Sequence, residues 1–316
     1  MVRLLFIILL GYLAGCQQTF VMESEQIVSP TAASSPVVLA GTPQSRSVPT
    51  RAATIPPAIE SDPIMTLTPD RQLAGPWLSP TPSLTLTMGE QVIGQSVEGR
   101  DITVRHIGSG PRIILLVGGI HGGWEENTVA LVNELITHFE NTPEDILPGM
   151  SLAFVPSANP DGLIHGRVEV GRFNANGVDL NRNWGCDWSE DAIWRSQSVF
   201  AGSEPMSEPE TQALARYIQD TRPVIVLFYH SSAGGVYAGE CDGDHGSMIM
   251  SQILGEATGY SYGEVFTAYP VTGTAASWVD GQGIPSADVE LFSWTETEFE
   301  RNLNGIMRLQ RWLSVE

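Results

Sequence analysis

Two histidines in this sequence each follow an apolar run that is typical of a buried strand. His121 comes after RIILLVGGI, and His230 comes after PVIVLFY. Two adjacent glutamates, Glu125 and Glu126, follow the first histidine within HGGWEENT. Two imidazoles and one carboxylate form a ligand set for catalytic zinc, with a fourth position open for water that the metal acidifies. The pattern therefore predicts one Zn²⁺ site, although either histidine alone is more often a hydrogen-bonded loop residue.

A polar segment between the two histidines, GVDLNRNW, carries side chains that a core cannot easily absorb. Asp179 can accept a hydrogen bond from a ligand histidine and fix its tautomer. Asn181 and Arg182 can hold a substrate carboxylate, because a guanidinium fork matches that group. Upstream, Arg172 can face a developing oxyanion. Without the other motifs, a loop stabilised by its own polar side chains explains the segment equally well.

A third apolar segment, SADVEL, carries two carboxylates. Strand alternation puts Asp288 and Glu290 on one face and the apolar residues on the other. Beside a zinc-bound water, Glu290 can act as general base and then as proton donor to the leaving amine. Taken alone, Glu290 is as easily an exposed residue at the edge of a strand.

The elements that must carry these residues alternate between short apolar runs and helical patterns. Residues 101–108, 112–120, 151–159, 223–231 and 286–291 read as strands. Residues 126–139 and 207–220 read as helices, the second opening on a Ser207/Glu210 capping box. In the last segment one helical face carries Phe299, Leu303, Ile306, Leu309 and Leu313. Continuous apolar strands separated by helices predict a doubly wound α/β domain with a mainly parallel, mixed sheet and helices on both faces.

The N-terminal segment predicts export and an anchor. MVRLLFIILLGYLAGC has one arginine, an apolar run too short to span a bilayer, and an ending similar to a bacterial lipobox. We expect residues 1–15 to be a lipoprotein signal peptide and Cys16 to be lipidated, which would hold the protein to a bacterial envelope membrane, outside the cytoplasm. Residues 16–86, rich in Ser, Thr and Pro, would form a disordered tether to a domain at 87–316. An ordinary cleaved signal peptide is the alternative.

The charge of the chain bears on its binding partners, and its cysteines bear on a possible disulfide. The formal net charge of −20 argues against a nucleic-acid partner, because phosphate binding needs clustered basic residues. Cys186 and Cys241 are the two remaining cysteines, and in an exported protein they can form a disulfide. The sequence leaves that pairing open. We expect a monomer.

The whole set of motifs resembles the zinc metallocarboxypeptidases of the carboxypeptidase A type. The resemblance covers about residues 88–316, in family order: IGQSVEGRDI, GGIHGG, NPDG, GRFNANGVDLNRNW, SEPET, YHSSAGG and VEL. RFNANGVDLNRN is most similar to the bacterial murein-peptide amidase branch, which trims cell-wall peptides. The resemblance implies a carboxypeptidase A-like fold and a zinc peptidase acting on a peptide or cell-wall peptide.

The resemblance also implies a role for individual residues. His121 and His230 match zinc ligands, and Glu290 matches the general base. Arg172 matches the arginine that polarises the scissile carbonyl, and Asn181 with Arg182 matches the pair that holds the terminal carboxylate. Asp179 matches the partner of a zinc histidine. Tyr269, nine residues before Trp278, matches a mobile tyrosine that closes over substrate.

The opening motif departs from the family pattern, which has glutamate three residues after the histidine. Trp124 stands there instead, with Glu125 four residues away and Glu126 five. A Gly-rich loop can absorb one extra residue as a local bulge. Glu125 would then lie at a helix start, where the helix dipole favours a carboxylate. We therefore predict Glu125 as the ligand over Glu126, with loss of zinc binding as a remaining alternative.

Specificity and rival functions stay open at this level. At the position that sets side-chain specificity in the family, this sequence has Ala276, which carries no charge. Asp288 shares a face with Glu290 and can point into the pocket for the residue after the cut, where it would suit a cationic side chain; an Asp paired with a nearby Arg is the alternative. The rivals to a carboxypeptidase are a murein-peptide amidase cleaving before diaminopimelate, an inactive surface binding module, and a deacylase of small acylated amino acids.

Overall fold

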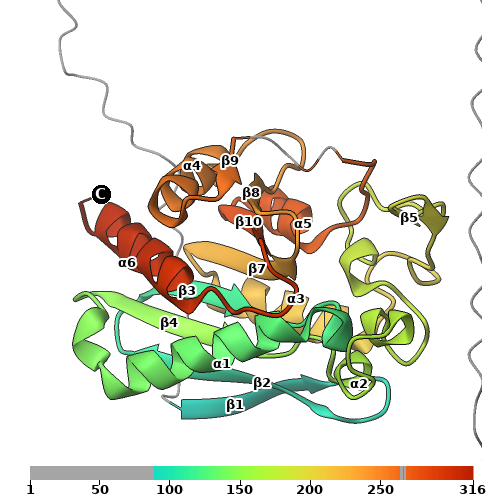
Figure 1. Cartoon of the computed structure of the whole chain (residues 1–316), viewed down its shortest axis with the longest axis horizontal. Coiled ribbons are helices and arrows are strands. Elements are labelled where there is room, and N and C mark those ends of the chain that lie inside the picture. The colour runs from blue at the N-terminus through green and yellow to red at the C-terminus, as the bar shows by residue number, and fades with distance from the viewer. Residues whose placement is uncertain (1–88, 264–265, 267, 316) are drawn as a thin grey trace, which may run out of the picture. The chain divides into compact units, whose positions relative to one another are not determined.

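An eight-stranded mixed sheet in the order β1-β2-β4-β3-β7-β10-β8-β9 forms the centre of the domain (Figure 1). The computed structural model describes residues 89–263, 266 and 268–315. The sheet strands are β1 Gly89–Gln95, β2 Asp101–Gly108, β3 Arg112–Val117, β4 Met150–Val155, β7 Ile225–Ser231, β8 Gly235–Ala238, β9 Ser261–Tyr262 and β10 Ser286–Leu291. A separate hairpin joins β5 Ile193–Trp194 to β6 Gln197–Ser198.

The described residues also form six α-helices and four short 3-10 helices. The α-helices are α1 Glu126–Asn141, α2 Pro160–Leu163, α3 Pro209–Thr221, α4 Ser247–Thr258, α5 Ala275–Gly281 and α6 Phe299–Val315. The 3-10 helices are Gly122–Glu125, Pro143–Asp145, Glu169–Arg172 and Leu180–Arg182.

The four central strands, β4, β3, β7 and β10, run parallel to one another. All residues of β4 and β7 are buried, as expected for parallel strands covered on both faces. Antiparallel pairings at β1–β2, β2–β4 and β10–β8 make the sheet mixed. Because β3, β7 and β10 point the same way, the segments that follow them emerge at one edge.

Two apolar cores lie on the two faces of the sheet. Alternation along β3 sends Ile113, Leu115 and Val117 to one core and Ile114 and Leu116 to the other. Helices α3 and α5 contribute to the first core, and α1, α4 and α6 to the second. Helix α1 crosses in front of the sheet in Figure 1. The predicted doubly wound fold with helices on both faces is confirmed.

The start of α3 corrects one prediction. The helix begins at Pro209 with Glu208 as its N-cap and no capping side chain. Ser207 Oγ donates to the Glu208 carboxylate instead, at 2.7 Å. Proline is favoured at the first helical position because it lacks the N–H that would be unsatisfied there. The predicted Ser207/Glu210 capping box is therefore wrong, and Glu210 accepts from Val97 N and Asn174 Nδ2.

A disulfide joins Cys186 to Cys241, a pairing that the sequence left open. The bond spans 55 residues and ties the loop before β5 to the segment after β8. Replacing both cysteines by serine is expected to lower the free energy of unfolding by about 2–4 kcal/mol, because the unfolded chain has more conformational entropy without the cross-link. Urea denaturation of the oxidised protein and of the double variant measures the difference, and equal midpoints would contradict the prediction.

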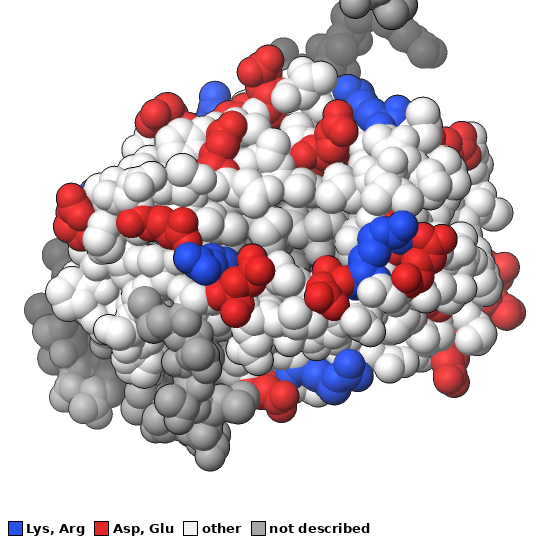
Figure 2. All heavy atoms as spheres, turned by 90° about the horizontal axis from the view of Figure 1, so that it is seen from below, with Lys and Arg blue, Asp and Glu red and all other residues white. Residues whose placement is uncertain are grey.

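Acidic side chains are spread over the face seen in Figure 2, and the few basic ones lie beside them. Within the part of the chain that the structure describes, no helix has the length and apolarity needed to cross a membrane. The predicted signal peptide, Cys16 and the tether at 16–86 lie outside the described residues.

Candidate active site

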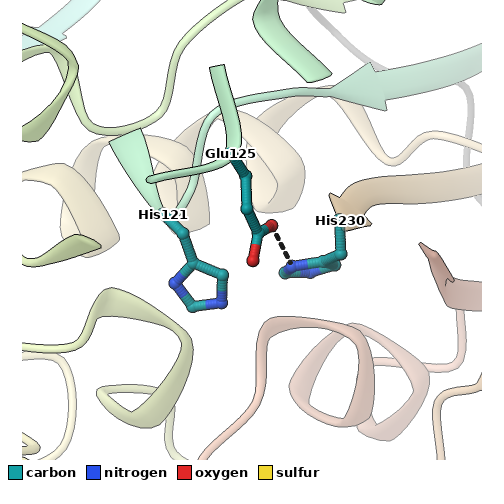
Figure 3. A group of neighbouring side chains, drawn as sticks. All are labelled: His121, Glu125 and His230. Atoms are coloured by element: carbon teal, nitrogen blue, oxygen red, sulfur yellow. Dashed lines mark ion pairs between the residues drawn. The ribbon is translucent and has the colours of Figure 1, made fainter. Parts of the chain in front are cut away.

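Three buried side chains converge where strands β3 and β7 end: His121, Glu125 and His230. One donor atom from each lies within 4.8 Å of the other two. Figure 3 shows the Glu125 carboxylate between the two imidazoles, with Oε2 lying 3.3 Å from His230 Nδ1. Two imidazoles and one carboxylate in this arrangement can hold a zinc ion.

The extra residue between His121 and its glutamate is absorbed by a 3-10 helix, Gly122–Glu125. Gly122 has a φ of +46°, and a Cβ there would lie 2.6 Å from the carbonyl oxygen of Gly171, so only glycine fits. The turn brings Glu125 into the cluster and leaves Glu126 exposed at the first position of α1. Of the two glutamates, Glu125 is the one beside the histidines.

Electrostatics at the cluster suit a cation. Burial, and then Arg172, lower the pKa of His121 well below its usual value, which keeps this imidazole in the neutral form that binds metals. Burial opposes protonation of His230, but Asp288 and Glu125 outweigh it and raise its pKa well above its usual value. The same negative field favours a divalent cation between these ligands.

Arg172 and Asp179 lie against the cluster as a buried ion pair. Arg172 NH2 lies 2.9 Å from Asp179 Oδ2, and its NH1 lies 3.7 Å from Glu125 Oε1. Asp179 Oδ1 lies 3.5 Å from His121 Nδ1, which has no hydrogen-bond partner among the described residues. The Asp179 carboxylate thus orients Arg172, the residue expected to face the oxyanion, and also lies beside the imidazole of His121.

Asn181 and Arg182 line the same pocket, and backbone contacts hold both. Asn181 Oδ1 accepts from Ala275 N at 2.8 Å. Arg182 donates from Nε to Ile193 O and from NH1 to Asn181 O, at 3.0 and 2.6 Å. These bonds fix the guanidinium while part of it faces the pocket, as a carboxylate-binding residue requires.

Strand β10 brings Asp288 and Glu290 to the pocket, as the alternation predicted. Burial raises the pKa of Glu290 to about 7, while His230 pulls it in the other direction. A group with a pKa near neutrality can both accept and return a proton. Glu290 Oε2 accepts from Ala233 N at 3.1 Å, which orients the carboxylate.

Asp288 also makes a contact that the sequence did not predict: its Oδ1 lies 3.1 Å from His230 Nε2. The parallel register of β10 with β7 pairs Glu290 with His230 and so brings Asp288 near the imidazole. A carboxylate on the far nitrogen of a ligand histidine fixes its tautomer and raises its basicity. Sequence spacing gives no signal for this contact, because register is a tertiary property.

Tyr269 lies half-buried at the pocket, with its ring 4.9 Å from that of Phe266. Burial raises its pKa, so the phenol keeps its proton near neutral pH.

Ala276 is buried in the core, and the structure does not bring it to the pocket lining.

The pocket encloses about 160 Å³ and has a wall of residues that the sequence reasoning missed: Trp194, Arg195 and Trp294. Trp194 and Arg195 belong to the β5–β6 hairpin, and Trp294 follows β10. A two-residue strand, a tight turn and the segment after β10 are too short for a sequence period to mark a face.

Curated relatives show which known sequences this chain resembles. It is 30% identical over 224 residues to bacteriocin BCN5 of Clostridium perfringens, covering 67% of this chain and 24% of the relative. It is 30% identical over 171 residues to inactive metallocarboxypeptidase ECM14 of Ajellomyces dermatitidis, covering 46% of this chain and 29% of the relative. The chain thus spans under a third of the length of each.

Solved structures share the fold. Bovine thrombin-activatable fibrinolysis inhibitor, solved with tick carboxypeptidase inhibitor, superposes with a TM-score of 0.62 at 18% identity, over 72% of this chain and 90% of that one. Murein-tripeptide amidase MpaA of Escherichia coli O157 gives a TM-score of 0.55 at 24% identity, over 72% and 93%. The zinc carboxypeptidase family model matches residues 87–299. With this match, the chain belongs to the zinc carboxypeptidase family.

Proposed function

We propose that this protein is a zinc-dependent carboxypeptidase that hydrolyses the peptide bond before a residue bearing a carboxylate. One observation carries the proposal: the metal-binding cluster, the carboxylate Glu290 and the cation Arg172 line a single pocket. When bound, zinc supplies an acidified water and polarises the carbonyl. Membership of the family supports zinc as the metal.

In this proposal the residues of the chain divide the work. Glu290 takes a proton from the attacking water and returns it to the leaving amine. Arg172, held by Asp179, faces the oxygen on which negative charge develops. Asn181 and Arg182 grip the substrate's terminal carboxylate. Tyr269 closes over the substrate and excludes water.

Paired peptides that differ only at the C-terminus test this function. The zinc-loaded protein is expected to release the last residue from a peptide with a free carboxylate, and to cleave the amidated peptide much more slowly. Mass spectrometry of the products identifies the bond that is cut. Equal rates on both peptides would exclude the carboxylate grip, and no cleavage together with no bound metal would favour the inactive binding module.

A second candidate is cleavage before a residue with a cationic side chain, such as lysine or the amino group of diaminopimelate in a murein peptide. Asp288 favours it, because this carboxylate lines the pocket beside Glu290. The murein-peptide amidase hypothesis belongs here, and hydrolysis of murein tripeptide against ordinary peptides separates it from a general carboxypeptidase.

Asp288→Asn tests that preference. Losing a charged hydrogen bond should lower kcat/KM for a lysine-ending peptide about 10- to 100-fold relative to a leucine-ending one. Asp288 also contacts His230, so zinc affinity is expected to fall as well. The ratio between the two peptides at saturating zinc is therefore the measure, and an unchanged ratio would rule out the specificity role.

The cellular location is part of the same proposal. Export followed by acylation of Cys16 would place the domain outside the cytoplasm on an envelope membrane. Radiolabelled fatty acid should enter the full chain expressed in a bacterium and should not enter the Cys16→Ser variant. Equal labelling of both would exclude the anchor.

A further inference from the structure

Three tryptophans form a continuous aromatic shelf beside the metal cluster: Trp124, Trp194 and Trp294. The ring of Trp124 lies edge-on to the other two, with centroids 5.4 Å from Trp194 and 5.9 Å from Trp294. Trp124 immediately precedes Glu125, and the face of Trp194 carries Arg172 at 4.5 Å. The shelf therefore adjoins both the metal cluster and the cation expected at the oxyanion.

Two exposed arginines lie on this shelf, in addition to buried Arg172. The Arg195 guanidinium lies 5.0 Å from the Trp194 centroid, and that of Arg167 lies 4.7 Å from the Trp294 centroid. Among the residues whose positions are described, neither guanidinium has a carboxylate within the 4.0 Å of an ion pair. The chain has 36 acidic residues against 16 basic ones, so two arginines on one shelf that lack an acidic partner among the described residues are unexpected.

The backbone at Arg195 is costly for an arginine. Arg195 and Ser196 form the two-residue turn between β5 and β6, since Trp194 pairs with Gln197. Arg195 has a φ of +59°, a left-handed conformation in which glycine is favoured at the first turn position. Residues held in such conformations cluster at functional sites. The turn puts a charged side chain at the pocket wall where local preference calls for glycine.

We propose that Arg195 and Arg167 bind a carboxylate in the part of the substrate that precedes the cleaved bond. This inference rests on the proposed function, which assigns the terminal carboxylate to Asn181 and Arg182. Carbonyl oxygens already hold Arg182, and Asp179 holds Arg172, whereas no described residue pairs with the guanidinium of either shelf arginine. Stacking on indole limits the motion of each guanidinium and leaves its edge free for a planar anion.

The substrate class that follows is a peptide with an acidic residue immediately before the cut. Such a residue brings its carboxylate toward the shelf while the scissile carbonyl faces Arg172. Asp288 inside the pocket would then bind a positive charge on one side of the cleaved bond, and Arg195 at the pocket wall, with Arg167 on the same shelf, would bind a negative charge on the other side. An acidic residue before the cut and a cationic residue after it would satisfy both sites.

Two N-acylated dipeptides that share their last residue and differ before the cut, one with glutamate and one with glutamine, test the proposal. The wild-type ratio of kcat/KM for the glutamate peptide over the glutamine peptide should fall about three- to tenfold in Arg195→Gln/Arg167→Gln. Arg216→Gln/Arg308→Gln is the matched control, because it removes two exposed charges of helices α3 and α6 that do not lie on the tryptophan shelf. An unchanged ratio in the shelf variant overturns the proposal.

Binding measured without turnover separates this proposal from the proposed function. In a zinc-loaded Glu290→Gln background, calorimetry should show the same preference for the glutamate peptide, lost when the two arginines are replaced. If wild type cleaves neither peptide but this preference is present, the anion site stands and the proposed function fails. If cleavage is normal and the preference is absent, the anion site fails alone; absence of binding by either peptide also overturns it.

Arg195→Gly adds a readout that a merely structural role would not produce. Glycine removes the left-handed strain, so the melting temperature should stay within about 2 °C of wild type or rise. The preference for the glutamate peptide should nevertheless fall. A fall in stability with an unchanged preference would mean that Arg195 only supports the hairpin.

Discussion

Replacing Glu290 by glutamine is expected to lower kcat by about 10²- to 10⁴-fold, the usual contribution of a positioned general base. Glutamine keeps the shape of the side chain and an oxygen that can accept from Ala233 N. It cannot accept the proton of the attacking water, because an amide is not basic near neutral pH. Stopped assays at high enzyme concentration, with a peptide bearing a free C-terminal carboxylate, measure the residual rate.

Two controls make the result specific. Zinc content should remain at the wild-type level in Glu290→Gln, because Glu290 lies outside the three-residue metal cluster. Glu300→Gln, at an exposed position in α6, makes the same chemical change away from the pocket and should keep full activity. A Glu290→Gln variant with wild-type kcat would remove Glu290 from the reaction.

Replacing Glu125 by glutamine is expected to weaken zinc binding by more than about 100-fold. This exceeds the 10- to 100-fold cost of losing an outer partner of a ligand, because the anionic ligand itself is lost. Glu125 is the carboxylate of the cluster, and Arg172 NH1 lies 3.7 Å from it, so the change also removes one of the two carboxylates beside this cation, leaving Asp179. Competition with a chelator of known zinc affinity measures the loss.

Glu126→Gln is the matched control on the adjacent residue. Glu126 is exposed at the start of α1, and the same substitution there should leave zinc affinity and activity near wild type. Full zinc retention in Glu125→Gln, or zinc loss in Glu126→Gln, would contradict the assignment of the ligand. The pair is informative because the two residues are adjacent in the sequence, whereas Glu125 is buried and Glu126 is exposed.

The fold could be predicted from the sequence because its signals are local. Strands β3, β7 and β10 are apolar runs, and α6 presents Ile306, Leu309 and Leu313 on one buried face. Polar residues that follow buried strands meet at the carboxyl edge of a parallel sheet, so His121 and His230 could be expected near each other. The error at the start of α3 arose because Pro209 competes with Ser207 for the helix start.

By itself, the sequence determined the strand ends on which the histidines and Glu290 stand, since apolar periodicity and strand polarity are properties of short segments. Only the tertiary structure decided between Glu125 and Glu126, because a 3-10 turn with Gly122 at positive φ sets which carboxylate turns inward. The contact of Asp288 with His230 depends on the register between β10 and β7. The disulfide and the tryptophan shelf likewise join segments far apart in the chain, and no local pattern encodes their approach.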